Sequence, residues 1–420
     1  MPNSRRAFLQ SSLVAGVSLL AVPMGVRRGR AVADEDNALA YRLSRDVPTK
    51  FFDGKRCWCH PRAGIVAGAG RDGRPRVVMT MNSLDLAGSD VFRGVFGLMT
   101  DDMGQTWSDV NELKPMAPRE ETIDGVRRPV AASDLTPGWH AASKSLLATG
   151  HSVVYTPEWR VVPQRPRQSV FASYDPAADD WSAWQKLPMP DATKFYNSGA
   201  GCTQRYDEAD GTILLPFYFR PPESNSRVAV MRCGFDGHEL KYLEHGSELG
   251  IDDETRGVGE PSLTRFGDDY LLTVRHDRRA YVARGRDGLH FGPLRAWTFD
   301  DGSELGSYNT QAHWVTHSDG VFLVYTRRGL NNDHVFRHRA PLVMAQVDPE
   351  ELCVIRATEQ VLVPERGARL GNFGVTDVTR DETWVTVAEW MQPVGCEKYG
   401  SDGSVYVARL HWKQPNTLVG

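Results

Sequence analysis

Short apolar runs, separated by turns that contain glycine or aspartate, recur along most of the chain, and no long amphipathic helical pattern interrupts them. The most apolar run of each repeat is nearly continuous, as in Ile213–Phe219 and Val321–Tyr325. Runs this rich in β-branched and aromatic residues predict strands that are buried on both faces. The four other runs of this kind are Val77–Met81, Ser152–Tyr155, Tyr270–Val274 and Trp384–Ala388.

Each of these six runs, called strand B, stands in the same order of elements. A strand A and a tight turn precede it, and a strand C and an outer strand D follow it. The turns before strand B lie at Asp72, Thr149, Asp210, Asp268, Asp319 and Asp381. The C strands are Gly94–Thr100, Ser169–Tyr174, Arg227–Cys233, Ala280–Arg284, Pro341–Val347 and Ser404–Leu410.

A four-strand unit that occurs six times predicts an all-β fold, a six-bladed β-propeller of four-stranded antiparallel blades. A jelly roll or a pair of sandwiches is the alternative, but such folds rarely repeat one unit six times. The last blade needs a strand from the N-terminal part to close the ring, and Ala38–Phe52 is expected to supply it.

The end of the first strand C carries a specific motif. Thr100–Trp107 follows the pattern Ser/Thr-x-Asp-x-Gly-x-Thr-Trp, in which Asp102 caps the turn amides and Gly104 takes a positive φ. Weaker copies occur at Ser173–Asp175, Cys233–Gly237 and Gly285–Phe291. This motif resembles the Asp box (BNR repeat) of the sialidase (neuraminidase) superfamily, and the chain as a whole resembles that superfamily. The motif is structural, so it indicates fold and not activity.

Charge is distributed unequally between the two sets of connections. The turns before strand B are mostly acidic, whereas the B–C loops, which face the central funnel of a propeller, carry more arginine and lysine than acid. Arg220, Arg275 and Arg327 end strand B in three successive blades. Arg62 lies at the start of strand A in the first blade. A guanidinium forms a planar fork for a carboxylate. We therefore predict that these arginines bind a substrate carboxylate, as an arginine triad does in sialidases, unless they pair with acids of their own loops.

The resemblance also implies catalytic roles. Retaining sialidases use a tyrosine nucleophile activated by a glutamate, with an aspartate as the acid. By blade position Glu260 resembles that glutamate. Tyr308 or Tyr196 would be the tyrosine, and Asp90 or Asp85 the acid.

Several features depart from the superfamily pattern. The first blade begins with His60-Pro61-Arg62 instead of Arg-Ile-Pro, and Glu389-Trp390 stands in the sixth blade where the nucleophile is expected. The polar run Asn331–Arg339 is too long for a plain turn. Histidines gather at the predicted mouth, at His60, His276, His313, His334 and His338.

These histidines favour a second reaction. In a uronate lyase a cation neutralises the substrate carboxylate, which acidifies the proton at C5, and a histidine or tyrosine removes that proton. His60, His313 and His338 are the candidate bases. A third alternative is a non-catalytic glycan-binding propeller. The first choice remains a sialidase-like exo-glycosidase that acts on an acidic oligosaccharide or polysaccharide.

The N-terminal segment has the order of a twin-arginine signal. Arg5 and Arg6 precede Phe8, an apolar run covers Leu13–Val26, and Ala31–Ala33 forms a small-x-small cleavage site. We expect a signal at residues 1–33 and the propeller at 34–420, with an uncleaved anchor as the alternative. This predicts a bacterial, periplasmic or secreted protein, exported by the twin-arginine machinery without stable membrane insertion.

Charge and cysteine content restrict the remaining classes. A net charge of −4 argues against nucleic-acid binding. Six cysteines in 420 residues do not make a disulfide framework. Cys57, Cys59 and His60 lack a second cluster to complete a zinc site, so neither a metal nor a cofactor is predicted.

Overall fold

The computed structural model describes residues 40–163 and 165–419. The predicted signal, residues 1–33, lies outside the described residues. In the described part of the chain, regular structure consists of β-strands and five short 3₁₀ turns, and no helix is long and apolar enough to cross a membrane. The 3₁₀ turns are η1 (Arg71–Gly73), η2 (Lys114–Met116), η3 (Phe336–His338), η4 (Arg356–Thr358) and η5 (Cys396–Tyr399).

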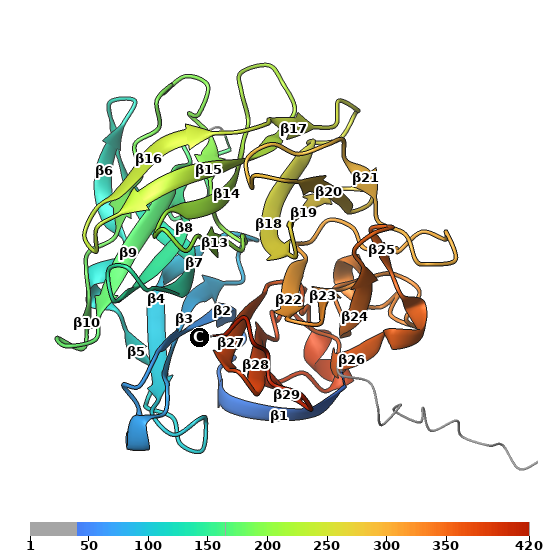
Figure 1. Cartoon of the computed structure of the whole chain (residues 1–420). Coiled ribbons are helices and arrows are strands. Elements are labelled where there is room, and N and C mark those ends of the chain that lie inside the picture. Colours follow the sequence, from blue (N-terminus) through green and yellow to red (C-terminus); the bar gives the residue numbers. More distant parts are fainter. Residues whose placement is uncertain (1–39, 164, 420) are drawn as a thin grey trace, which may run out of the picture. The chain divides into compact units, whose positions relative to one another are not determined.

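The strands form six antiparallel sheets, which are the blades of the predicted six-bladed propeller (Figure 1). Blade 1 contains β2 (Arg56–Val66), β3 (Arg76–Asp85), β4 (Phe92–Thr100) and β5 (Asn111–Glu112). Blade 2 contains β6 (Arg119–Ile123), β7 (Val126–His140), β8 (Ser145–Val154), β9 (Ser169–Asp175), β10 (Asp180–Trp181) and β11 (Gln185–Lys186). Blade 3 contains β12 (Ser198–Gly199), β13 (Tyr206–Asp207), β14 (Ile213–Phe219), β15 (Arg227–Phe235), β16 (Leu240–His245) and β17 (Leu249–Gly250).

The second half of the chain completes the ring. Blade 4 contains β18 (Val258–Phe266), β19 (Asp269–His276), β20 (Tyr281–Gly285) and β21 (Arg295–Ala296). Blade 5 contains β22 (His313–His317), β23 (Gly320–Tyr325), β24 (Leu342–Asp348), β25 (Cys353–Val354) and β26 (Gln360–Val363). Blade 6 contains β27 (Phe373–Thr379), β28 (Glu382–Ala388), β29 (Ser404–Trp412) and β1 (Tyr41–Lys50).

The predicted strand B forms the interior of each blade. The run Ile213–Phe219 is β14 itself, and all seven of its residues are buried. Strands β23 and β28 are buried along their whole length as well. A strand that is covered on both faces by neighbouring blades must be apolar at every position, which explains why the alternating pattern of a one-sided sheet is missing from these runs.

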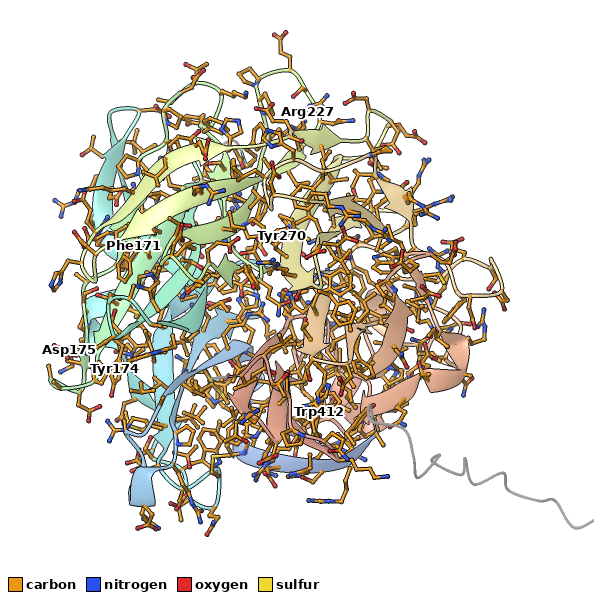
Figure 2. The ribbon with its side chains drawn as sticks, viewed as in Figure 1. Phe171, Tyr174, Asp175, Arg227, Tyr270 and Trp412 are labelled. Carbon is orange, nitrogen blue, oxygen red and sulfur yellow. The ribbon has the colours of Figure 1, made fainter. Side chains whose placement is uncertain are left out.

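Strand β1 closes the ring, as predicted for Ala38–Phe52. It pairs with β29 from Tyr41 opposite Trp412 to Lys50 opposite Ser404, and Figure 1 shows the blue β1 alongside the red β29. Trp412, labelled in Figure 2, is 7% exposed, and its ring centroid lies 5.5 Å from that of Tyr41. Aromatic packing therefore joins the two ends of the described chain.

Replacing Trp412 with alanine is expected to lower the free energy of unfolding by about 3 kcal/mol, because it leaves a cavity beside Tyr41 of β1 and Phe322 of β23. The substitution also removes the hydrogen bond from Trp412 Nε1 to Thr383 Oγ1 (2.9 Å). Urea unfolding measures the loss. Leu418, 61% exposed, provides the control, and Leu418→Ala should change stability by at most about 0.5 kcal/mol. Equal losses in both variants would contradict the closing role of β1.

One predicted turn is wrong. Thr149 lies inside β8, opposite Thr136 on one side and Phe171 on the other, and β7 and β8 are joined instead by Ala141–Lys144. That turn contains neither glycine nor aspartate, and Lys144 itself takes a φ of +53°. The usual turn residues were therefore absent from the sequence at this point.

The turn after β4 has the hydrogen bonds expected from its sequence. Asp102 Oδ1 accepts from the Thr106 amide (2.8 Å) and from Thr100 Oγ1 (2.9 Å), and Gly104 has a φ of +79°. The bonds from Thr106 lower the pKa of Asp102 to about 2. An aspartate also caps turn amides after the C strands of blades 2 to 5, at Asp175 (Figure 2), Asp236, Asp287 and Asp348.

Candidate functional site

Three inner strands carry a bulge with a left-handed residue. His60 in β2, Asp134 in β7 and Glu260 in β18 have φ values of +54°, +54° and +45°. At each of them two residues oppose one residue of the next strand. Cys202, between β12 and β13, and Asn309, before β22, are left-handed as well. Such conformations cost about 1–3 kcal/mol each and cluster at functional sites.

A cavity of about 230 Å³ lies among these residues, at the side of the propeller where the B–C loops are predicted to form the funnel. All six B–C loops contribute to its lining, through Asp90, Arg167, Ser226, Asp277, Arg339 and Trp390 among others. Six arginines line the cavity against three carboxylates, those of Asp90, Glu260 and Asp277. The arginines are Arg167, Arg256, Arg275, Arg337, Arg339 and Arg369. The cavity is therefore cationic.

Only two of these six arginines are neutralised. Arg275 pairs with Glu260, and Arg256 pairs with Asp277. Within the described ranges no carboxylate lies within 4.0 Å of Arg167, Arg337, Arg339 or Arg369, and each therefore lacks a salt-bridge partner there. Arg339 and Arg369 are only 4% and 2% exposed. A buried cation without a counter-ion is unfavourable, so these residues favour a bound anion.

Arg339 and Arg369 come from the β23–β24 loop and from the segment before β27. Burial and the charges of Arg275 and Arg369 lower the pKa of Arg339 well below its usual range. Burial and Arg337 lower that of Arg369 to about 10. The Arg369 guanidinium lies 3.9 Å from the centroid of the Trp390 ring, which orients it. The Nε atoms of Arg339 and Arg369 have no hydrogen-bond partner among the described residues.

Arg275 is held in place by two acceptors. It donates to Glu260 Oε1 and to Asn309 Oδ1, and both partners have a left-handed backbone, Glu260 within β18 and Asn309 before β22. Arg256 donates to the same Asn309 oxygen (3.2 Å). The strained backbone thus fixes Arg275 at the cavity wall.

The opposite wall is formed by blades 2 and 3. Tyr218, in β14, lies beneath Gly259, where an added Cβ would be 4.0 Å from its ring. Burial raises the pKa of Tyr218, and the nearby Glu260 raises it further. The Arg167 guanidinium lies 5.2 Å from the Tyr218 ring centroid. Glu260 and Tyr218 are therefore neighbours that both face the cavity.

Burial disfavours the protonated form of two histidines on the cavity wall. Burial lowers the pKa of His60. Burial and the charge of Arg167 lower that of His151 well below its usual range. Nδ1 of each ring is buried without a partner in the described residues. The Nε2 lone pair of His60 already accepts from the Asn372 amide, so His151 is the potential base of the two.

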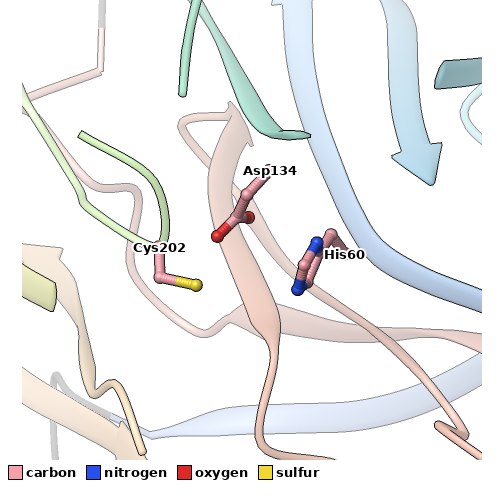
Figure 3. Close-up of side chains that lie close together, drawn as sticks. All are labelled: His60, Asp134 and Cys202. Carbon is pink, nitrogen blue, oxygen red and sulfur yellow. The ribbon is translucent and has the colours of Figure 1, made fainter. Parts of the chain in front are cut away.

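His60, Asp134 and Cys202 offer one ligand atom each within 4.8 Å of one another (Figure 3). Nitrogen, oxygen and sulfur ligands of this kind suit zinc. However, Asp134 Oδ1 already accepts two bonds from Arg62, at 2.7 and 3.0 Å, and Asn372 donates to Nε2 of His60 (2.5 Å). A guanidinium on the same carboxylate repels a divalent cation, so these residues fit a metal poorly.

The structure brings together four of the residues predicted from the sequence. His60, Asp90, Glu260 and Arg275 line the cavity. Arg220 and Arg327 do not line it, so the three arginines that end strand B do not converge. Arg220 is exposed and donates to Ser224 O (3.1 Å), whereas Arg327 is bound by Glu359 (2.7 Å).

The other predicted catalytic and carboxylate-binding residues lie outside the cavity lining, whereas His276, one of the histidines predicted at the mouth, lines it. Tyr308 Oη is bonded to His338 Nδ1 (2.7 Å), and His338 Nε2 to Asp333 (3.2 Å). His313 is bonded to Ser262 (2.7 Å), and burial lowers its pKa to about 3. Arg62 is fully buried and ion-paired with Asp134, so it is not free to bind a substrate.

Sequence reasoning missed five important lining residues, Arg339, Arg369, Arg167, His151 and Tyr218. Two signals were available. Arg339 ends the polar run Asn331–Arg339, and Arg167 lies in a basic B–C loop. Tyr218 and His151 gave no signal, because both lie within apolar strands whose inward-facing positions are fixed only by the assembled ring.

Comparison with known proteins identifies the fold. No protein-family model matches the chain, and no curated protein matches it. A solved protein of unknown function from Dyadobacter fermentans is 13% identical, with a TM-score of 0.60 over 88% of this chain and 99% of that one. The Trypanosoma rangeli sialidase is 14% identical, with a TM-score of 0.53 over 88% and 60%. The NanB sialidase from Streptococcus pneumoniae is 10% identical, with a TM-score of 0.58 over 89% and 70%.

The chain is therefore a sialidase-like six-bladed β-propeller. It spans about 60% of the length of the T. rangeli sialidase. At these identities the likeness concerns the fold, and the cavity itself must support any statement on activity.

Proposed function

We propose that the chain is a carbohydrate-active enzyme, a sialidase-like exo-glycosidase that acts on a glycan with a terminal carboxylate-bearing sugar. The observation that carries the proposal is the pair Arg339 and Arg369, which line the cavity, are almost fully buried and have no carboxylate partner among the described residues. A carboxylate bound between two guanidiniums neutralises them through charge-assisted hydrogen bonds of about 1.5–3 kcal/mol each. The exported location predicted from the N-terminal segment suits a protein that meets such glycans.

The size of the cavity supports an end-of-chain substrate. Its volume of about 230 Å³ is below the range of about 300–1,000 Å³ that is usual for ligand sites. A single sugar unit fits such a space, and the rest of the glycan would extend through the open side between the B–C loops.

The cavity also contains groups suited to hydrolysis. In the proposed mechanism the arginines hold the carboxylate, and Asp90 protonates the leaving oxygen. Tyr218 takes the place that the sequence assigned to Tyr308, since Tyr218 lines the cavity beside Glu260. Glu260 would then assist Tyr218 as its neighbouring base, held in place by its ion pair with Arg275.

Replacing Asp90 with asparagine is expected to lower kcat on an acidic glycan by about 10²-fold, because the amide cannot donate a proton to the leaving oxygen. The fold should be unaffected, since Tyr155 bonds to the Asp90 backbone carbonyl (2.7 Å) and not to its side chain. Steady-state kinetics measures the change. Asp72→Asn, in the exposed turn η1, is the control. If Asp90→Asn were as active as Asp72→Asn, Asp90 would be excluded as the acid.

A uronate lyase is the second candidate, and one observation favours it. His151, whose pKa burial lowers, lines the cavity together with Tyr218. A neutral base close to a carboxylate that arginines neutralise is the arrangement that proton abstraction at C5 requires.

Turnover of a mixed panel of sialylated and uronate-containing glycans distinguishes the two reactions. We expect new reducing sugar without ultraviolet absorbance, which a hydrolase produces. Rising absorbance would show the unsaturated product of a lyase and overturn the hydrolase. Binding of the acidic glycans without either signal would leave only the glycan-binding propeller.

A further inference from the structure

A second pair of arginines without acidic partners lies in the β8–β9 loop, away from Arg339 and Arg369 in the chain. Arg165 is 7% exposed, and its guanidinium bonds only to the Val162 carbonyl (3.0 Å) among described groups. Arg167 lines the cavity, and Nε of both Arg165 and Arg167 is buried without a partner in the described residues. The part of the chain that the structure describes places no carboxylate within 4.0 Å of either one.

The two guanidiniums are close enough to act on one another. Burial and the charge of Arg167 lower the pKa of Arg165, and Asp90 opposes this shift without forming an ion pair. His151 extends the same surface, because its pKa is depressed by burial and by Arg167, and its Nδ1 is unpartnered among described atoms. Repulsion between buried cations again calls for an anion.

Two glycines make room for this arrangement. A Cβ at Gly199 would be 2.8 Å from Cβ of His151 and 3.0 Å from Cδ of Arg167. A Cβ at Gly201 would be 1.7 Å from Nδ1 of His151. Any larger residue at these positions displaces His151 and Arg167, so the backbone of blade 3 is adapted to their side chains.

This group is distinct from the arginines that the proposed function uses. Arg165 and Arg167 belong to blade 2, and the Arg167 guanidinium lies over the ring of Tyr218 of blade 3. Arg339 comes from blade 5 and Arg369 precedes blade 6. The charges of Arg275 and Arg369 act most on Arg339, and the charge of Arg337 acts most on Arg369. The cavity is thus cationic on two walls.

We propose that Arg167 and His151, which line the cavity, form a second anion-binding subsite to which the buried Arg165 adds its charge, and that the substrate carries two anionic groups. The first is the carboxylate held by Arg339 and Arg369. The second is either a sulfate ester on the same sugar or the carboxylate of the adjoining acidic sugar, since both present oxygens to guanidinium and imidazole N–H donors. This inference rests on the proposed function, because it adds a second contact to the same substrate.

Titration calorimetry with three probes tests the subsite. The probes are glucuronic acid, glucuronic acid with one sulfate ester, and a disaccharide of two uronic acids. We expect one of the doubly charged probes to bind the unmodified protein at least roughly tenfold more tightly than glucuronic acid. The doubly charged probe that binds more tightly than glucuronic acid identifies the source of the second anion. Equal affinity for all three would overturn the subsite.

Variants separate this subsite from the first. Arg167→Met should abolish the gain and leave the Kd for glucuronic acid unchanged, whereas Arg160→Met, at an exposed position of the same loop, should change neither. Gly199→Ala, which displaces the same side chains, should reproduce the effect if Arg167→Met folds poorly. A gain that survives both variants would contradict the proposal. If Arg369→Met lost binding to all three probes, and no doubly charged probe bound the unmodified protein more tightly than glucuronic acid, only the site of Arg339 and Arg369 would be supported and the second subsite would be overturned.

Discussion

The double variant Arg339→Met/Arg369→Met is expected to lower kcat/KM on a carboxylate-bearing glycan by about 10²–10⁴-fold. Each guanidinium would contribute about 1.5–3 kcal/mol to a bound carboxylate, and methionine keeps much of the side-chain length without the charge. The melting temperature of the free protein should stay the same or rise, because two buried cations without described counter-ions are removed. Steady-state kinetics and thermal unfolding measure the two effects.

The control for this prediction is Arg220→Met. The sequence places Arg220 at the end of strand B, equivalent to Arg275, but in the structure it is exposed and does not line the cavity. Its replacement should leave kcat/KM unchanged. A loss as large as that of the double variant would show that Arg220 binds the carboxylate, as predicted from the sequence, and would contradict the site found in the structure.

The second large effect concerns the ion pair at the propeller axis. Arg62→Ala is expected to lower the free energy of unfolding by about 3–5 kcal/mol, because Asp134 would remain buried without its cation. Both side chains are 0% exposed, and Arg62 also donates to Gln311 (3.0 Å) of blade 5. The residue therefore links inner strands of blades 1, 2 and 5, and urea unfolding measures its contribution.

An exposed ion pair gives the comparison. Lys241 and Glu239, whose side chains are 59% and 60% exposed, form a salt bridge of 3.1 Å at the surface of blade 3. Lys241→Ala should change stability by less than about 1 kcal/mol. If Arg62→Ala were as mild, the axial pair would not hold the inner strands together.

The fold could be predicted because burial leaves a direct trace in the sequence. A strand covered on both faces must be apolar throughout, and Ile213–Phe219 shows this without interruption. Register and turns depend on weaker signals. The β7–β8 turn at Ala141–Lys144 was missed, because it lacks the residues that usually mark a turn and uses Lys144 at a positive φ instead.

The site was predicted only in part, because equivalence in sequence does not determine where a long side chain points. Arg275 and Arg327 end strand B in adjacent blades, yet Arg275 is directed to the cavity by Glu260 and Asn309, whereas Glu359 holds Arg327 elsewhere. These partners come from other strands and appear only when the ring is assembled. Tyr308 and His338 likewise bond to one another instead of lining the cavity.

The left-handed bulges could not be predicted from the sequence, for a related reason. His60, Asp134 and Glu260 have no glycine at the strained position, so their sequences resemble ordinary strand residues. The conformation belongs to the bulge in the pairing of each inner strand with strand B, where two residues oppose one. Glu260 was nevertheless selected correctly as a cavity residue, because its blade position resembles that of the sialidase glutamate.

The central claim is that Arg339 and Arg369 of the cavity bind a sugar carboxylate. Its most direct test is to measure the binding of matched ligands by calorimetry. N-acetylneuraminic acid and glucuronic acid are each compared with their own methyl ester, which has the same ring but no charge. The account predicts that at least one acid binds and that its ester binds at least roughly tenfold more weakly. Equal affinity of acid and ester, or no binding of either acid, would contradict it.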